Sequence, residues 1–288
     1  VGIDNQGLSG IELAYDEYLK GEDGSIKYYS DGFGKKLEKA TVYSSPQSGM
    51  NVALTIDINI QQAIENELDN VVAKYNPEQA LIVVANPKTG EIYGMSSRPN
   101  FNPNEYNKYD LETINRNLPI FNTYEPGSTF KVISLASSIQ EKTINLFEDN
   151  YFDSGSINVS GSRIKCWKHG GHGSQTFLQV VENSCNPGFV VMGERLGKER
   201  LMDYVKKFGF GEKTGIDLSG EENGILFDVD KMGPVETATT AFGQGVSVTP
   251  IQQVMGVSAA VNGGHLYTPY LVSSISNANT LDTVLVNK

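Results

Sequence analysis

Residues 124–131 read Tyr-Glu-Pro-Gly-Ser-Thr-Phe-Lys, so a Pro-Gly turn is followed by a serine and, three residues later, by a lysine. The apolar residues beyond Lys131 predict a helix that begins near Ser128, with both side chains on one face. The N-terminus of a helix also presents free backbone N–H groups, which stabilise an oxyanion. The stretch predicts a nucleophilic serine with its base, although an ordinary capped helix start has the same pattern.

The composition of the 288-residue chain is that of a globular protein large enough to bury a sizeable core. Its net charge of −11 argues against nucleic acid as a partner, because neutralising phosphates needs a basic face. The longest apolar run, Ala80–Ala85, is far shorter than the roughly 18 residues of a membrane span. Two cysteines are too few for a disulfide scaffold. Because the chain begins with Val1, we expect a fragment of a longer protein.

Hydrophobic periodicity and turn residues divide the chain into a polar start and a longer folded region. Residues 1–48 are expected to be the remnant of an accessory domain, and residues 49–288 the main domain. The Gly-rich residues 150–173 and 209–249 are expected to be mostly irregular. The predicted helices span 9–19, 57–75, 128–139, 175–182, 188–196, 198–207 and 250–261, and the predicted strands 51–56, 80–85, 91–96 and 265–273. Because helices and strands do not alternate strictly, we predict an α+β fold with helices packed on a mainly antiparallel sheet.

A second polar pair, Ser184 and Asn186, lies where one predicted helix ends and the next begins. Side chains two residues apart in an extended turn point the same way. A hydroxyl and a carboxamide so placed can relay a proton and hold a substrate amide. The alternative is helix-capping chemistry, which is common for serine and asparagine.

Around these motifs the chain carries further runs: Leu54-Thr55-Ile56-Asp57, Arg98-Pro99-Asn100-Phe101, Phe208-Gly209-Phe210-Gly211 through Gly220-Glu221, and Phe242-Gly243-Gln244-Gly245 through Thr249-Pro250-Ile251-Gln252. Together with residues 124–131 and Ser184-Cys185-Asn186, they resemble the transpeptidase domain of class B penicillin-binding proteins, in the family's order over about residues 49–273. Glu125-Pro126-Gly127 resembles the division and sporulation branch of this family more than its elongation branch.

The resemblance implies the serine-transpeptidase fold, with residues 1–48 from the pedestal domain, and the cross-linking of peptidoglycan stem peptides through an acyl-enzyme that β-lactams also form. It implies Ser128 as nucleophile, Lys131 as base, Ser184 as proton relay and Asn186 as holder of the donor peptide, with no catalytic cofactor. It further implies a membrane-bound cell-wall assembly complex on the extracytoplasmic face, anchored by an N-terminal helix outside this sequence. Two alternatives stay open: a D,D-carboxypeptidase or β-lactamase-type hydrolase, and a non-catalytic penicillin-binding scaffold.

The family's third motif, Lys-[Thr/Ser]-Gly, follows the Gly-Gln-Gly segment on an edge strand. This chain has Lys213-Thr214-Gly215, but upstream of Gly243-Gln244-Gly245. Its surroundings, Ile216-Asp217-Leu218 among them, resemble a structural loop of the family. We therefore expect Lys213–Gly215 to be unrelated to catalysis, and the true third motif to lie beyond Lys288 or to be missing, so that the domain is truncated at its C-terminus.

Both cysteines and two of the three histidines fall within a short stretch around Gly170-Gly171. Cys166, His169, His172 and Cys185 predict a tetrahedral zinc site of structural type, with Asp153 as an alternative ligand. Two other interpretations stay open, a Cys166–Cys185 disulfide in an oxidising exterior and free thiols packed as small hydrophobes. The third histidine, His265, is expected to be an ordinary strand-edge residue.

Overall fold

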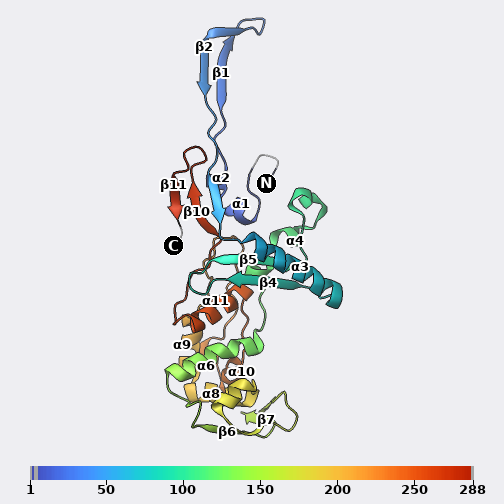
Figure 1. Cartoon of the computed structure of the whole chain (residues 1–288), viewed down its shortest axis with the longest axis vertical. Coiled ribbons are helices and arrows are strands. Elements are labelled where there is room, and N and C mark those ends of the chain that lie inside the picture. Colours follow the sequence, from blue (N-terminus) through green and yellow to red (C-terminus); the bar gives the residue numbers. More distant parts are fainter. Residues whose placement is uncertain (1, 3–5, 287–288) are drawn as a thin grey trace. The chain divides into compact units, whose positions relative to one another are not determined.

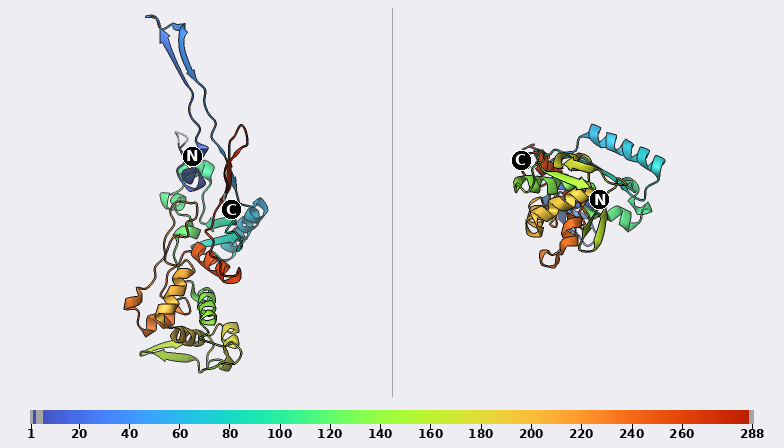
Figure 2. Two further views of the ribbon diagram at one scale, coloured as in Figure 1. Left: turned by 90° about the vertical axis from the view of Figure 1, so that its left-hand side faces the viewer. Right: turned by 90° about the horizontal axis from the view of Figure 1, so that it is seen from below.

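The computed structural model describes residues 2 and 6–286, with the backbone alone described at 36–42. Its helices and strands are drawn in Figures 1 and 2. Contacts divide the chain into two compact units. The first unit comprises 1–56, 217–219 and 270–288, and the second comprises 57–216 and 220–269. The domain boundary expected at residue 48 stays a prediction. It concerns which domain the segment comes from, whereas these two units are defined by contacts between residues.

The first unit contains a hairpin and a three-stranded sheet. Strand β1 pairs antiparallel with β2, and the sheet has the strand order β11-β10-β3. The Asp217 carboxylate accepts hydrogen bonds from the backbone N–H groups of Leu271 (2.7 Å) and Val272 (2.8 Å) and from the Tyr15 hydroxyl (2.8 Å), which ties the 217–219 loop to this unit. Its elements are α1 (Gly10–Ala14), α2 (Asp16–Leu19), β1 (Ser25–Ser30), β2 (Lys36–Ser44), β3 (Asn51–Leu54), β10 (Val272–Ser276) and β11 (Thr283–Val286).

The second unit begins with a helix packed on a hairpin, and the helix and both strands lie where the sequence predicts them. Helix α3 (Ile58–Tyr75) begins after Asp57, whose side chain accepts hydrogen bonds from the N–H groups of Asn59 and Ile60. It packs against the antiparallel strands β4 (Ala80–Ala85) and β5 (Ile92–Arg98). Its Ile64 and Leu68 side chains are buried. The cap and the apolar stripe together fix this element.

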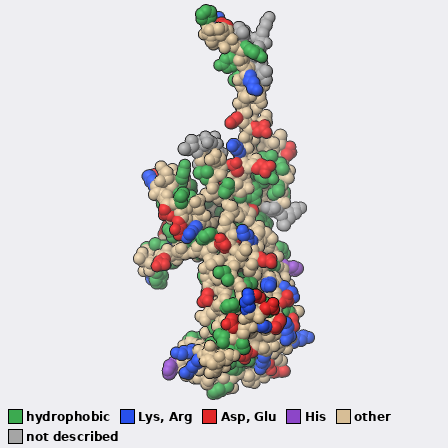
Figure 3. Space-filling view, turned by 180° about the vertical axis from the view of Figure 1, so that it is seen from behind, with side chains coloured by type: hydrophobic (Ala, Val, Ile, Leu, Met, Phe, Trp, Pro, Cys, Tyr) green, Lys and Arg blue, Asp and Glu red, His purple; other side chains and the backbone are tan. Residues whose placement is uncertain are grey.

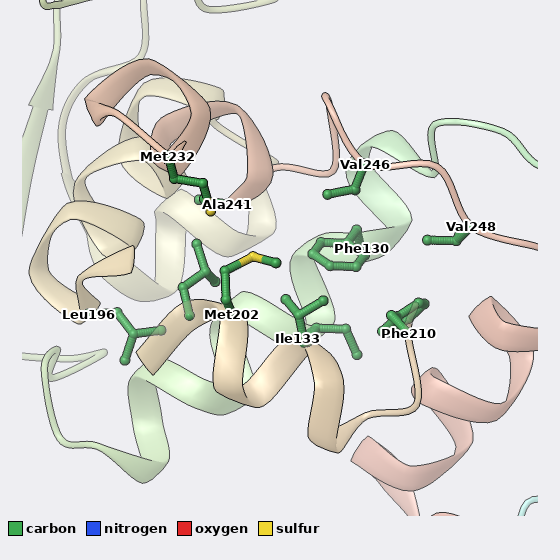
Figure 4. Packing of buried hydrophobic residues seen from close by; sticks show 11 residues of the cluster. Phe130, Ile133, Leu196, Met202, Phe210, Met232, Ala241, Val246 and Val248 are labelled. Carbon is green, nitrogen blue, oxygen red and sulfur yellow. The ribbon is translucent and has the colours of Figure 1, made fainter. Parts of the chain in front are cut away.

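The rest of the second unit is mainly helical, with its core around α6 (Figure 4). Phe130 and Ile133 are fully buried, and the rings of Phe130 and Phe210 lie 5.1 Å apart. Helix α6 packs against α8, α9 and α11, so it is central to this unit. The elements are η1 (Pro103–Lys108), α4 (Leu111–Asn115), α5 (Leu118–Phe121), η2 (Gly127–Phe130), α6 (Lys131–Gln140), α7 (Phe177–Glu182), α8 (Asn186–Leu196), α9 (Lys198–Lys207), η3 (Val229–Lys231), α10 (Pro234–Thr240) and α11 (Pro250–Val261).

The expectation of mostly irregular structure is wrong for residues 150–173, and it holds for 209–249 apart from η3 and α10. Four strands occupy the segment predicted as irregular, and they are β6 (Asn150–Asp153), β7 (Ser156–Val159), β8 (Ser162–Lys165) and β9 (Gly173–Thr176). Strand β6 pairs with β9, and β7 with β8. The glycines end strands here: Gly161, with a φ of +88°, closes the β7–β8 hairpin. Helix α10 was likewise missed. All strand pairs of the described residues are antiparallel. Helix α3 packs on β4 and β5, and the combination of helices with antiparallel strands confirms the predicted α+β class.

Acidic and basic side chains are interspersed on the face drawn in Figure 3. Among the described residues, every helix is too short or too polar to cross a membrane.

Candidate active site

Ser128 lies in η2, a single 3-10 turn that runs directly into α6. The serine therefore precedes the α-helix, which differs from the prediction that it opens that helix. Its side chain is exposed. The neighbouring Gly127 has a φ of +56°, a left-handed conformation that glycine adopts without strain. The Pro-Gly pair thus turns the chain so that Ser128 stands on the surface just before a buried helix.

The turn before Ser128 is fixed by a segment far along the chain. Tyr124 and Val248 exchange two backbone hydrogen bonds of 3.0 and 2.9 Å, and the Gly127 N–H donates to the Gly243 carbonyl oxygen at 2.9 Å. Gly243 has a φ of +79°, and a Cβ there would clash with the Gly127 carbonyl oxygen. The structure therefore brings together two of the runs on which the family resemblance rests.

Lys131 is the first residue of α6, and its side chain is buried with a relative exposure of 5%. Its Nζ donates hydrogen bonds to the Ser184 carbonyl oxygen (2.9 Å), the Ser184 Oγ (3.0 Å) and the Asn186 Oδ1 (2.6 Å). It also lies 5.0 Å from the centre of the Phe189 ring. The structure thus brings three of the four predicted catalytic residues into direct contact.

Burial lowers the pKa of Lys131 to about 8, although the Cys185 and Cys166 thiols oppose this shift. Removing an ammonium from water disfavours its charged form. Roughly a tenth of the amine is therefore neutral at pH 7, far more than for an ordinary lysine, and a neutral amine can accept a proton from a hydroxyl. This is the electrostatic state that a serine nucleophile needs in its base.

Ser184 lies between α7 and α8, and Asn186 is the first residue of α8, so the pair stands where one helix ends and the next begins, as the sequence predicts. Ser184 has a φ of +48°, which is uncommon for a residue with a side chain. Strain of this kind persists where the surroundings enforce it and is frequent at functional sites. The Ser184 N–H donates to the Val181 carbonyl oxygen at 3.0 Å, and the Cys185 N–H donates to the Val180 carbonyl oxygen at 3.0 Å. These bonds close the end of α7 and turn Ser184 toward Lys131.

Glu125 is a supporting residue whose role sequence reasoning missed. Its carboxylate accepts a hydrogen bond from the Gly245 N–H at 2.7 Å. Gln253 supports the same turn from α11, because its Nε2 donates to the Thr129 carbonyl oxygen at 3.1 Å. Glu125 and Gly245 both lie in sequence motifs that resemble the family, but neither motif indicates that the two residues are in contact. A contact between residues so distant in sequence has no local signal.

Lys213-Thr214-Gly215 lies in a loop and is held by a buried carboxylate. Glu221 accepts hydrogen bonds from the Thr214 N–H (2.7 Å), the Thr214 Oγ1 (2.5 Å) and the Gly215 N–H (3.1 Å). Glu221 has a relative exposure of 6%. The hydroxyl and the backbone donors of the triplet are therefore engaged in fixing the loop.

The structure brings four candidate metal ligands together: Asp153, Cys166, His172 and Cys185. His169, which the sequence analysis included among the four ligands, is exposed and lies outside this group. Its place is taken by Asp153, which was the alternative ligand. Burial alone would raise the pKa of Asp153, but hydrogen bonds from Cys166, Gly155 and His172 lower it to about 2. Burial raises the pKa of the Cys185 thiol to about 12.

Comparison with known families gives two matches along the chain. The penicillin binding protein transpeptidase domain matches residues 80–288, and the penicillin-binding protein dimerisation domain matches residues 2–54.

Similar proteins include stage V sporulation protein D of Bacillus subtilis, 58% identical over 98% of this chain and 44% of that protein. The peptidoglycan D,D-transpeptidase FtsI of Escherichia coli is 29% identical over 95% of this chain and 45% of its own length. Among solved structures, penicillin binding protein 3 of Mycobacterium tuberculosis complexed with aztreonam has a TM-score of 0.85 at 25% identity, covering 100% of this chain and 61% of the other. These matches confirm the predicted resemblance to class B penicillin-binding proteins and, within the sporulation branch, to stage V sporulation protein D. The chain spans less than half the length of these two curated relatives.

Proposed function

Because the chain belongs to the penicillin binding protein transpeptidase family, we propose that it carries the acylation centre of a peptidoglycan D,D-transpeptidase. The observation that carries this proposal is the contact of the buried Lys131 amine with both Ser184 and Asn186. A lysine with a lowered pKa, three residues after an exposed serine, is the activated pair that acyl transfer requires. The substrates are peptidoglycan stem peptides, and β-lactams are their mimics.

In the first step the Ser128 Oγ attacks the carbonyl carbon of the penultimate D-Ala of a donor stem peptide. The neutral Lys131 amine takes the hydroxyl proton as the new C–O bond forms. Backbone N–H groups of the η2 turn, where Ser128 lies, are positioned to stabilise the developing oxyanion. Collapse of the tetrahedral intermediate breaks the C–N bond and leaves an acyl-enzyme.

The leaving D-Ala amine needs the proton that Lys131 has taken. An ammonium has three N–H donors, and the three acceptors around Lys131 use all of them. Of these acceptors only the Ser184 hydroxyl can also donate, so it is the group that passes the proton to the leaving amine. Asn186 accepts through Oδ1, which leaves its amide N–H groups free to bind a carbonyl oxygen of the donor peptide.

The second half-reaction regenerates the enzyme. An amine of a neighbouring stem peptide attacks the acyl-enzyme, loses a proton through the same Ser184–Lys131 path, and releases Ser128 as the cross-link forms. Because this substrate lies outside the cytoplasm, we place the protein on the extracytoplasmic face of the membrane, in a cell-wall assembly complex. We further propose that an N-terminal helix anchors the protein in the membrane.

The test is labelling with a fluorescent penicillin. We expect stable, stoichiometric labelling that Ser128→Ala abolishes. Ser162→Ala, which removes an exposed hydroxyl from β8, is the matched control and should label normally. Labelling that survives Ser128→Ala would refute the nucleophile.

Label that forms and is then released within the assay would favour the hydrolase over the transpeptidase. Absence of any label on folded protein of full length would favour the non-catalytic scaffold.

A further inference from the structure

We propose that Glu125 and Gln253 are positioning residues for the candidate nucleophile Ser128, and that together they set the rate of its acylation. Each side chain makes one hydrogen bond that ties the η2 turn to a segment far along the chain. Both act on the serine through the backbone of this turn. The assignment rests on the proposed acyl transfer, because a positioning role needs a serine that reacts.

The local sequence does not by itself fix the position of Ser128. The η2 element is a single 3-10 turn, whose hydrogen-bond geometry is poorer than that of an α-helix, and neither η2 nor α6 begins with a side-chain cap. Gly127, directly before the serine, leaves the backbone free to change. A local side-chain bond joins the Thr129 Oγ1 to the Pro126 carbonyl oxygen at 2.8 Å. The position of the serine therefore depends also on contacts from elsewhere in the chain.

These contacts flank the serine on both sides. Three residues before Ser128, the Glu125 carboxylate accepts a hydrogen bond from the Gly245 N–H at 2.7 Å. One residue after the serine, the Thr129 carbonyl oxygen accepts a hydrogen bond from the Gln253 Nε2 at 3.1 Å. Ser128 thus lies between two side-chain hydrogen bonds to one distant segment.

The turn stays attached to this segment when either side chain is replaced. The Gly127 N–H donates to the Gly243 carbonyl oxygen at 2.9 Å, and Tyr124 and Val248 exchange two hydrogen bonds, all between backbone atoms. A substitution of either positioning residue leaves these bonds in place. We therefore expect it to shift the serine rather than to unfold the turn.

The burial of Gln253 supports a role for its amide. This side chain has a relative exposure of 7%, and its Oε1 is buried without a hydrogen-bond partner among the described residues. A buried polar atom without a partner costs free energy, which an apolar side chain of the same length would avoid. A carbonyl oxygen can accept only from the Nε2 of the amide, so the bond to Thr129 also sets the orientation of the amide. This bond accounts for a glutamine at the position.

Glu125 is tied to a firmly packed partner. Gly245 has a φ of +75°, and a Cβ there would lie 2.7 Å from the Phe227 ring, which packs against the core around Phe130. Glu125 and Gly245 are themselves exposed, so water can replace their bond at little cost in stability. A charge-assisted bond is nevertheless short and directional. Its loss should therefore affect the position of the turn more than the stability of the fold.

A shift of the serine matters because its base is held separately. Hydrogen bonds to Ser184 and Asn186 fix the Lys131 amine. Movement of the η2 turn therefore changes the distance between the Ser128 hydroxyl and an amine that stays in place. A misplacement of about 1 Å can slow an enzymatic reaction by about 10²-fold.

The experiment is stopped-flow acylation of the full-length protein by a fluorescent penicillin. It separates the dissociation constant of the first complex from the rate constant of acylation. We expect Glu125→Leu and Gln253→Met each to lower the rate constant by about tenfold. The dissociation constant should change little, because neither side chain is assigned a contact with the ligand.

Two control variants remove the same kinds of bond elsewhere in the second unit. Glu236→Leu removes a carboxylate that accepts from the Gly233 N–H at 2.9 Å, at the start of α10. Gln61→Met removes an amide that donates to the Met95 carbonyl oxygen at 3.0 Å. Both controls should acylate with the rate constant of the parent. Melting temperatures of all four variants show whether a slow rate merely follows a loss of stability.

A conservative variant tests the hydrogen bond itself. Glu125→Gln keeps an acceptor oxygen for the Gly245 N–H and should regain most of the rate that Glu125→Leu loses. If Glu125→Gln is as slow as Glu125→Leu, the bond to Gly245 does not position the serine and the proposal fails.

Parent-like rate constants in both Glu125→Leu and Gln253→Met would overturn the proposal while leaving the transpeptidase assignment intact. A raised dissociation constant with an unchanged rate constant would also overturn it, because the two residues would then serve binding. Absence of acylation in the parent protein would instead count against the proposed transpeptidase, and with it against this assignment.

Discussion

Two buried polar clusters meet at the tripeptide Ser184-Cys185-Asn186, and they differ in charge and in completeness. The first, the amine cluster, is Lys131 with Ser184 and Asn186, and each N–H of its ammonium has an acceptor. The second, the thiol cluster, is Asp153, Cys166, His172 and Cys185, and it gathers two thiols and an imidazole around a carboxylate. The amine cluster is centred on a cation that protein acceptors surround, whereas the thiol cluster is centred on the Asp153 carboxylate, which accepts hydrogen bonds from His172, Gly155 and Cys185.

The difference shows how one turn serves two purposes. Ser184 and Asn186 contact Lys131 in the amine cluster, and Cys185 between them contacts Asp153 in the thiol cluster. The strained Ser184 therefore lies between contacts to both clusters. A substitution in either cluster should therefore leave the other partly intact. The predictions below use this separation, and they run from the largest expected effect to the smallest.

Replacing the base should break the amine cluster alone. Lys131→Met keeps the length and burial of the side chain and removes the proton acceptor. A general base contributes typically 10²–10⁴-fold, so we expect acylation by penicillin to slow by about 10³-fold. The measurement is the second-order acylation rate constant of the folded variant.

The matched control for this variant is Lys165→Met, which removes an exposed lysine from β8 beside the thiol cluster. It should acylate at the parent rate. An acylation rate for Lys131→Met within tenfold of the parent would show that another group serves as base.

The parts of the fold that local signals determine were predictable from sequence. Periodicity predicted a helix over 57–75, and α3 begins there after the Asp57 cap. The Thr249–Gln252 capping box likewise begins α11 at the start of the predicted helix over 250–261. The apolar residues beyond Lys131 predicted the helix over 128–139, which contains most of α6. In each case the decisive interactions are within a few residues of one another.

What the sequence did not predict depends on distant contacts. The strands β6 to β9 were hidden because their glycines indicated irregular structure, whereas in the fold they occupy turns and close approaches between strands. Ser184 and Asn186 were assigned roles through the family resemblance, and their contact with Lys131 appears only in three dimensions. Asp153 replaced His169 in the thiol cluster for the same reason, because pairing of β6 with β9 decides which side chains meet.

A backbone substitution should loosen the thiol cluster alone. A Cβ on Gly171 would clash with the Asp153 carbonyl oxygen and the Gly155 amide nitrogen, and the φ of +77° adds strain. We expect Gly171→Ala to lower the free energy of unfolding by about 2–3 kcal/mol, measured by urea denaturation.

Gly170→Ala is the matched control for this variant, because its φ of +79° is similar and its Cβ meets open space. It should cost only about 1 kcal/mol, the price of the left-handed conformation. Equal losses in the two variants would mean that the approach of this loop to Asp153 does not stabilise the fold.

The pH dependence of acylation should report the amine cluster directly. The pKa of Lys131 is lowered to about 8 by burial, so protonation below that pH removes the neutral amine that acts as base. The acylation rate therefore rises as the pH increases through about 8. Well below pH 8 the rate falls about tenfold for each unit of decreasing pH. An exposed lysine, with a pKa of about 10.4, would instead give a rate still rising above pH 9. Lys131→Met should lose this dependence and keep a small, flat rate. A parent profile that is flat between about pH 6 and 8 would mean that the amine in contact with Ser184 and Asn186 is not the proton acceptor.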